Sequence, residues 1–265
     1  MTDRSTDATS RPLILLTNDD GFDAPGLLAL ASALPSSADV VIIAPDRNWS
    51  ASGHSRTLFA PIHTREVTLA NGAPAISTSG SPADCVALGL LGLAPRHPDL
   101  VISGINWGAN VGSDLTYSGT VAGARESALA GIVGIAASLD AVGDADFGPA
   151  ARFVARLALR LLAARASQPL LLNVNIPNLP EELIRGVQVT RLGQRIYRDE
   201  LLRREDPRGR PYYWIGGLAP TGVPAPGTDI GALAAGYISI TPLLLDPTDH
   251  AQLELVQGLT DAEES

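Results

Sequence analysis

The sequence has little cysteine, no long uninterrupted apolar run and no basic surplus. Its only cysteine is Cys85, so no intrachain disulfide can form. Cys85 lies in an apolar segment, residues 83–91, which favours a buried structural side chain over a nucleophile. Glycine, proline or charge interrupts every apolar run before membrane-spanning length, and residues 1–12 lack the apolar core of a signal peptide. These absences predict a soluble, cytoplasmic protein with no membrane partner.

The charge balance excludes a further class of function. The net charge is −9 and the sequence pI is about 4.8, which argues against a general nucleic-acid binder. A small anionic substrate is still compatible, because one bound metal ion can reverse the sign of the charge inside a pocket. Hydrophobic residues make up 45% of the chain, enough for a full core.

Short apolar runs alternate with helical stretches over the first two thirds of the chain. The predicted strands are 13–16, 40–44, 100–102, 132–136 and 170–174. The predicted helices between them are 26–33, 82–91, 121–130 and 149–164. Because the strands are continuously apolar rather than alternating, both of their faces should be covered. The pattern predicts an α/β fold, a Rossmann-like, mostly parallel sheet sandwiched by helices.

The pattern changes from about residue 186. Residues 187–191 alternate like a half-exposed strand, residues 191–210 are rich in charge, and residues 211–215 form an aromatic strand. A loop rich in glycine and proline is predicted to run from there to residue 231, before a later strand at 237–243. We therefore expect a disordered tail at 1–11, a catalytic core at 12–185, a β-rich C-terminal arm at 186–255 used in oligomerisation, and an acidic tail at 256–265.

Polar residues follow each of the first three predicted strands. The first strand is followed by Asn18, Asp19 and Asp20, the second by residues 46–50, and the third by residues 106–110. In an open parallel sheet, ligands bind outside the carboxyl ends of the strands, at the reversal of strand order. The three clusters should therefore meet in one cleft.

The chemistry of these clusters is rich in oxygen. Adjacent carboxylates such as Asp19 and Asp20 repel each other unless a cation or a proton relieves them. With a hydroxyl and an amide oxygen nearby, and no histidine or cysteine, the set favours Mg²⁺, Mn²⁺ or Ca²⁺ over zinc. Phosphate is the natural substrate group for such a metal site.

A second element suits an anion. Ser118, Gly119 and Thr120 precede a helical run, where free backbone N–H groups and hydroxyls can hold a phosphate. An ordinary helix cap explains the same residues, but this loop follows Asn106 and Asn110. At 81–84, by contrast, a serine cap, a proline and an aspartate satisfy the purely structural explanation.

Four motifs in this order resemble the SurE family, the survival protein 5′/3′-nucleotidases. They are LLTNDDGFDAPG, APDRNWSASGHS, STSGSPADCV and SGINWGANVGSDLTYSGTVAGARE, and ITPLLLDPTDH extends the resemblance towards the C-terminus. The resemblance implies a metal-dependent phosphatase that hydrolyses nucleoside 5′- and 3′-monophosphates, and in some members short polyphosphate. It also implies a homodimer or homotetramer formed by exchange of C-terminal arms.

The resemblance also implies roles for particular residues. One divalent ion per subunit, Mg²⁺ or Mn²⁺ with Ca²⁺ as an alternative, would be held by four metal ligands: Asp19, Asp20, Ser50 and Asn106. The substrate-binding residues would be Asn110, Ser118, Gly119 and Thr120, and the catalytic residues Asp19, Asp20 and Asn110. The chain departs from the family at Trp49 and Trp107, which are bulkier than the usual residues, and at His54, where asparagine is common.

Three other classes fit part of the pattern. A haloacid-dehalogenase-type phosphatase needs two aspartates separated by one residue, whereas here they are adjacent. A non-catalytic nucleotide-binding module lacks its usual glycine-rich turn, since only Gly21 and Gly26 follow the first strand. If the acidic cluster were a structural Ca²⁺ site, metal binding would stabilise the protein but no substrate would be hydrolysed.

Overall fold

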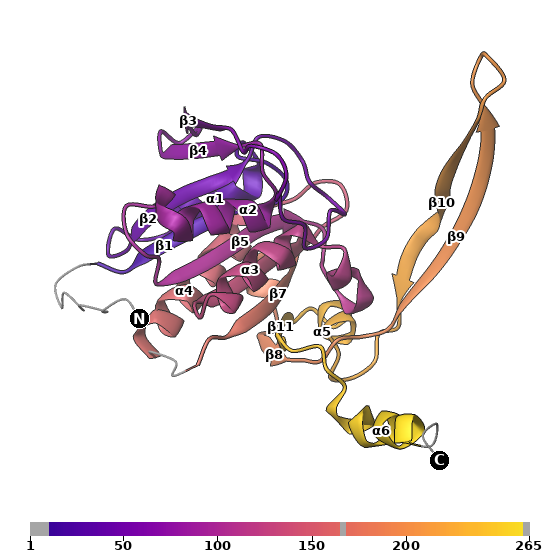
Figure 1. The fold of residues 1–265 in the computed structure, drawn as a ribbon. Helices are drawn as coiled ribbons and strands as arrows, with labels where there is room; N and C mark the ends of the chain where they lie inside the picture. The colour runs from indigo at the N-terminus through magenta and orange to yellow at the C-terminus, as the bar shows by residue number, and fades with distance from the viewer. Residues whose placement is uncertain (1–10, 165–167, 262–265) are drawn as a thin grey trace.

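The computed structural model describes residues 11–164 and 168–261, and its centre is a nine-stranded sheet (Figure 1). The strand order is β3-β4-β2-β1-β5-β6-β7-β11-β8. The six strands from β4 to β7 are all parallel. The strands of this sheet are β1 (Leu13–Thr17), β2 (Asp39–Pro45), β3 (Thr64–Thr68), β4 (Pro74–Thr78), β5 (Leu100–Trp107), β6 (Val133–Asp140), β7 (Leu171–Pro177), β8 (Val187–Val189) and β11 (Ile238–Pro242).

Helices cover both faces of the sheet, because the strands are apolar on both sides. The helix α1 packs against α4 on one face, and α2 packs against α3 on the other. The principal helices are α1 (Pro25–Ala33), α2 (Pro82–Leu88), α3 (Gly119–Leu129), α4 (Phe147–Ala164), α5 (Asp229–Ala234) and α6 (Leu253–Asp261). Short helical turns are η1 (Gly89–Leu93), η2 (Gly112–Thr116), η3 (Glu181–Leu183) and η4 (His250–Gln252).

The parallel strands confirm the predicted Rossmann-like α/β fold. Taken in chain order, the six parallel strands are arranged 3-2-1-4-5-6, so the order reverses between β1 and β5. Cys85 of α2 is fully buried, as predicted, and burial raises the pKa of its thiol to about 12. The predicted cap of α2 is also confirmed, since Ser81 and Asp84 form a reciprocal capping box.

The C-terminal part divides between the sheet and a projecting hairpin. The strands β8 and β11 extend the main sheet beyond β7. In contrast, β9 (Arg195–Glu205) and β10 (Pro211–Gly222) form a separate two-stranded antiparallel ribbon that stands away from the core (Figure 1). The predicted β-rich arm therefore corresponds to the projecting hairpin of β9 and β10. The division of the chain at 186 stays a prediction, because the same segment contributes strands to the core sheet.

Several elements differ from the sequence prediction. The predicted loop from 216 to 231 is confirmed only at residues 223–228 and is wrong at its ends, because β10 continues to Gly222 across a bulge near Leu218 and α5 begins at Asp229. The antiparallel pairing with β9 overrides the glycines and proline in this stretch. The pair β3 and β4 was missed, because β3 is an edge strand of mainly exposed polar residues.

The structure describes only part of each predicted terminal tail. The predicted tail at 1–11 lies outside the described residues except for Arg11. Of the predicted acidic tail, residues 256–261 belong to α6, whereas residues 262–265 lie outside the described residues. Within the described parts of the chain, none of the helices combines the length and apolar character that crossing a membrane requires.

Because α1 approaches β5 closely at Gly26, we can predict the effect of a larger residue there. A Cβ at this position would lie 1.9 Å from the carbonyl oxygen of Ile105 and 2.9 Å from a ring carbon of Phe147. We expect Gly26→Ala to lower the free energy of unfolding by at least about 1–3 kcal/mol, because a backbone atom must move. Chemical denaturation measures this. Gly258 of α6 has no atom within 4 Å of an added Cβ. Gly258→Ala is the control, and an equal loss in both variants would contradict the packing argument.

Candidate functional site

The three predicted polar clusters do meet at the carboxyl edge of the sheet. The backbone N–H of Trp49, from the loop after β2, donates to the carbonyl oxygen of Asp19 at 2.7 Å. The backbone N–H of Trp107, at the end of β5, donates to Oδ2 of Asp20 at 3.3 Å. The hydroxyl of Thr120, in the first turn of α3, donates to Oδ1 of Asp19 at 2.6 Å. The prediction of one shared cleft region is thereby confirmed in its geometry.

Asp19 is held against the N-terminus of α3. Its side chain is only 4% exposed, and an added Cβ on Gly119 would lie 2.8 Å from the Cβ of Asp19. Only glycine allows the helix to come this close. Burial raises the pKa of Asp19, while hydrogen bonds from Thr120 and from the backbone of Gly119 oppose that shift. The carboxylate therefore already lies at the helix end that sequence reasoning assigned to phosphate.

Asp20 lies beside it in a more open position. Burial, followed by repulsion from the charge of Asp19, raises the pKa of Asp20 to about 6, against the opposing backbone hydrogen bond from Trp107. Its Oδ1 faces Nδ2 of Asn48 at 3.5 Å. Sequence reasoning did not single out Asn48, although its position before Ser50 in the second cluster was a signal for it.

The other two predicted metal ligands, Ser50 and Asn106, are the sequence neighbours of Trp49 and Trp107, whose backbone N–H groups contact Asp19 and Asp20. Nδ2 of Asn106 donates to the carbonyl oxygen of Gly108 at 2.8 Å, which turns Oδ1 of the amide away from that carbonyl. Ser50 is exposed, and its backbone N–H donates to Oδ1 of Asn48 at 2.7 Å. Among the described residues, no group of three or more histidine, cysteine, aspartate or glutamate side chains could hold a metal ion. A metal at this site therefore depends on serine and asparagine oxygens as well as on the two carboxylates.

The predicted phosphate-binding residues are already hydrogen-bonded within the protein. Oγ of Ser118 caps α3 by accepting from the backbone N–H of Val121 at 3.1 Å. Nδ2 of Asn110 donates to Oγ of Ser138 at 2.8 Å, and Asn110 is 8% exposed. The structure thus brings Gly119 and Thr120 against Asp19. Asn110 is instead turned into a polar network between β6 and β7.

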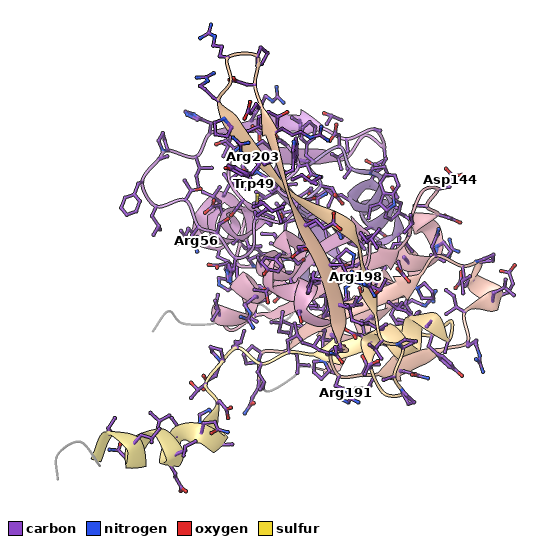
Figure 2. The ribbon with its side chains drawn as sticks, turned by 90° about the vertical axis from the view of Figure 1, so that its right-hand side faces the viewer. Trp49, Arg56, Asp144, Arg191, Arg198 and Arg203 are labelled. Atoms are coloured by element: carbon purple, nitrogen blue, oxygen red, sulfur yellow. The ribbon has the colours of Figure 1, made fainter. Side chains whose placement is uncertain are left out.

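A cluster of charged residues anchors the loop that carries Ser50. Nε2 of His54 lies 2.9 Å from Oε2 of Glu126 on α3, and Arg56 pairs with the same carboxylate. Arg56 also lies 3.3 Å from Oδ1 of Asp84 on α2. Hydrogen bonding from His54 is the largest effect that lowers the pKa of Glu126. His54 is thus part of a loop anchor, and Figure 2 labels Trp49 and Arg56 on this loop.

The fold and the site define an α/β protein with an acidic, oxygen-rich site where the strand order reverses. The model of the family described as survival protein SurE matches residues 14–199. A 5′-nucleotidase SurE of Herpetosiphon aurantiacus is 53% identical over 251 residues, 94% of this chain and 97% of that protein. A 5′-nucleotidase SurE of Chloroflexus aggregans is 52% identical over 243 residues, 91% of this chain and 96% of that protein.

A solved structure agrees with these sequence relatives. The crystal structure of the SurE protein from Aquifex aeolicus superimposes with a TM-score of 0.80 at 41% identity. The match covers 94% of this chain and 100% of that chain. The chain belongs to the SurE family, as the four sequence motifs indicated.

The raised pKa of Asp20 predicts a pH-dependent stability in metal-free buffer. Between the ordinary value of 3.8 and about 6, the folded protein holds a proton that the unfolded chain has lost. Stability therefore falls as the pH rises through this window. We expect Asp20→Asn to raise the free energy of unfolding by about 1–2 kcal/mol at pH 7.5, allowing for partial exposure, and by little near pH 4.

Urea denaturation at both pH values, with a chelator present, measures this difference. An equal change at pH 4 and pH 7.5 would show that the ionised carboxylate of Asp20, penalised by burial and by repulsion from Asp19, is not its cause. Asn48→Ala is a control that alters the same surroundings without removing a carboxylate.

Proposed function

We propose that this protein is a divalent-metal-dependent phosphatase that releases phosphate from nucleoside 5′- and 3′-monophosphates, with short polyphosphate as a further substrate. The observation that carries the proposal is the partly buried pair Asp19 and Asp20 at the reversal of strand order. The names of the relatives, which are 5′-nucleotidases, support the same reaction class.

The residues present fit a hard cation. Burial raises the pKa of both carboxyl groups, and within the described residues neither has an arginine or histidine ion-pair partner. Oxygen atoms of Asn106 and Ser50 complete a set that suits Mg²⁺ or Mn²⁺, with Ca²⁺ as an alternative. We assign one ion per subunit to Asp19, Asp20, Ser50 and Asn106. When bound, such an ion supplies charge neutralisation at the phosphate and a bound water of lowered pKa.

The surrounding side chains would then orient both the carboxylates and the substrate. Thr120 holds Asp19 through its 2.6 Å hydrogen bond, and the backbone N–H of Trp107 restrains Asp20. Ser118, Gly119 and Thr120 at the start of α3 offer donors to the phosphate oxygens. Asn110 would join them by turning its Nδ2 from Ser138 to the phosphate. These residues would place the phosphate for in-line attack by water.

The proposal predicts the loss of metal-dependent turnover when either carboxylate is neutralised. Asp19→Asn and Asp20→Asn should each reduce phosphate release by at least about 100-fold, since each removes charge that holds the ion and its water. The assay is phosphate release from 5′- and 3′-nucleoside monophosphates, short polyphosphate and an aryl phosphate, with Mg²⁺, Mn²⁺ or Ca²⁺ in turn. Circular dichroism controls for folding. Near-normal turnover of both variants at saturating metal would reject the site.

We also propose a homodimer or homotetramer assembled through the C-terminal arm. Exposed apolar side chains run along the hairpin; they are Ile196, Tyr197, Leu201, Leu202, Tyr212, Tyr213, Trp214, Ile215 and Leu218. The helix α6 exposes Leu253, Leu255, Val256 and Leu259. A lone hairpin is marginal in water, so a second copy that covers these surfaces would stabilise the arm.

The assembly can be tested without deleting strands of the core. Leu201 and Ile215 are paired across β9 and β10 and are 69% and 81% exposed. We expect the double variant Leu201→Arg, Ile215→Arg to shift the protein to monomer in light scattering, because two charges would be buried in the contact. Phe59→Arg, at a fully exposed aromatic outside the arm, is the control. A wild-type monomer at micromolar concentration would refute the assembly.

A further inference from the structure

A pocket of about 320 Å³ opens beside the acidic pair and is not used by the phosphate chemistry described above. Its lining residues are Asp20, Asp23, Ala24, Pro25, Gly26, Asn48, Trp107 and Phe147. The volume is at the lower end of the range for small-molecule sites. Because Asp20 belongs both to the acidic pair and to this wall, a substrate whose phosphate lies at the carboxylates can extend into the pocket.

The lining of the pocket combines two kinds of chemistry. Asp20 and Asn48 are polar, whereas Trp107 and Phe147 are aromatic. The side chain of Trp107 is 55% exposed, although its backbone N–H is fixed on Asp20. The indole of Trp107, which follows Asn106 in the sequence, is thus half open to solvent. A planar ring of a ligand can stack on such a surface.

An acidic group completes the pocket. Asp23 is exposed, and its carboxylate can only accept hydrogen bonds when ionised. It would therefore meet donors on a ligand, such as the hydroxyls of a sugar or the N–H groups of a base. An anionic group close to an ionised Asp23 would be repelled by it. The combination suits a neutral, planar, donor-bearing moiety attached to a phosphate.

We propose that this pocket is the nucleoside subsite, in which Trp107 stacks on the base and Asp23 accepts from the sugar hydroxyls or base N–H groups. The inference rests on the proposed nucleotidase function and specifies how that site distinguishes a nucleotide from other phosphate esters. Trp107 is then a specificity-determining residue, because its side chain contacts the substrate without taking part in the chemistry at phosphorus.

Steady-state kinetics with two substrates tests the role of Trp107. Adenosine 5′-monophosphate has a ring to stack, and glycerol phosphate has none. We expect Trp107→Ala to lower the ratio of kcat/KM for the nucleotide to kcat/KM for glycerol phosphate about tenfold or more. This ratio cancels any effect that acts on both substrates through Asp20, which the backbone of Trp107 restrains. Trp107→Phe should restore most of the nucleotide affinity. Phe59→Ala, which removes a fully exposed aromatic elsewhere, is the matched control.

The role of Asp23 is tested with altered nucleosides. Asp23→Asn should weaken binding of the ribonucleotide, and comparison with the 2′-deoxy form and with bases lacking exocyclic amines shows which donor it meets.

An equal loss of kcat/KM for nucleotide and glycerol phosphate in Trp107→Ala, or no loss in either, would overturn the subsite.

A binding measurement separates this inference from the proposed function. Adenosine, which carries no phosphate, should quench tryptophan fluorescence in metal-free wild-type protein and in Trp214→Phe, but not in Trp107→Phe. If the wild type hydrolyses neither ester, the proposed function fails, and this titration still decides the subsite. Quenching that persists unchanged in Trp107→Phe would overturn it.

Discussion

The burial of two adjacent carboxylates, Asp19 and Asp20, is the constraint around which this site is arranged. Burial is the main cause of the raised pKa of each carboxyl group, and repulsion from the charge of Asp19 adds to it at Asp20. The fold offsets part of the cost of burial with donors from three different segments: Thr120, the backbone of Trp107 and the amide of Asn48. What remains is an unneutralised pair of negative charges, which is a suitable environment for a divalent cation.

Close backbone contacts bring these donors to the pair. Gly26 lets α1 approach the carbonyl oxygen of Ile105, immediately before the polar end of β5. Gly119 lets the start of α3 reach Asp19. Since β1 and β5 are adjacent at the reversal of strand order, their carboxyl ends present Asp20 and Asn106 to the same space. The position of the site thus follows from the strand order. The close approach of α1 and α3 follows from Gly26 and Gly119, which have no side chain at these contacts.

The loop that leads into α3 also rests on the base of the arm. Asp114 of η2 accepts from the hydroxyl of Tyr197 at 2.5 Å and pairs with Arg195 at 2.6 Å, both on β9. The buried carboxylate of Asp229 joins the backbone N–H groups of Gly112 and Gly193. The arm and the loop before Ser118 therefore share anchors. Any contact that orders the base of the arm would therefore also restrain the segment that leads to the start of α3.

The sequence by itself determined the parallel α/β core, because continuously apolar strands followed by polar residues have few alternative arrangements. It also indicated that Asp19, Asp20 and the residues after β2 and β5 would meet, since parallel strands present their carboxyl ends to one edge. Only the tertiary structure decided what each side chain touches there. The bond from Thr120 to Asp19, the inward turn of Asn110 and the anchoring of His54 on Glu126 join residues 28 to 101 positions apart. No local pattern encodes such pairings, because they depend on how closely helices and strands pack.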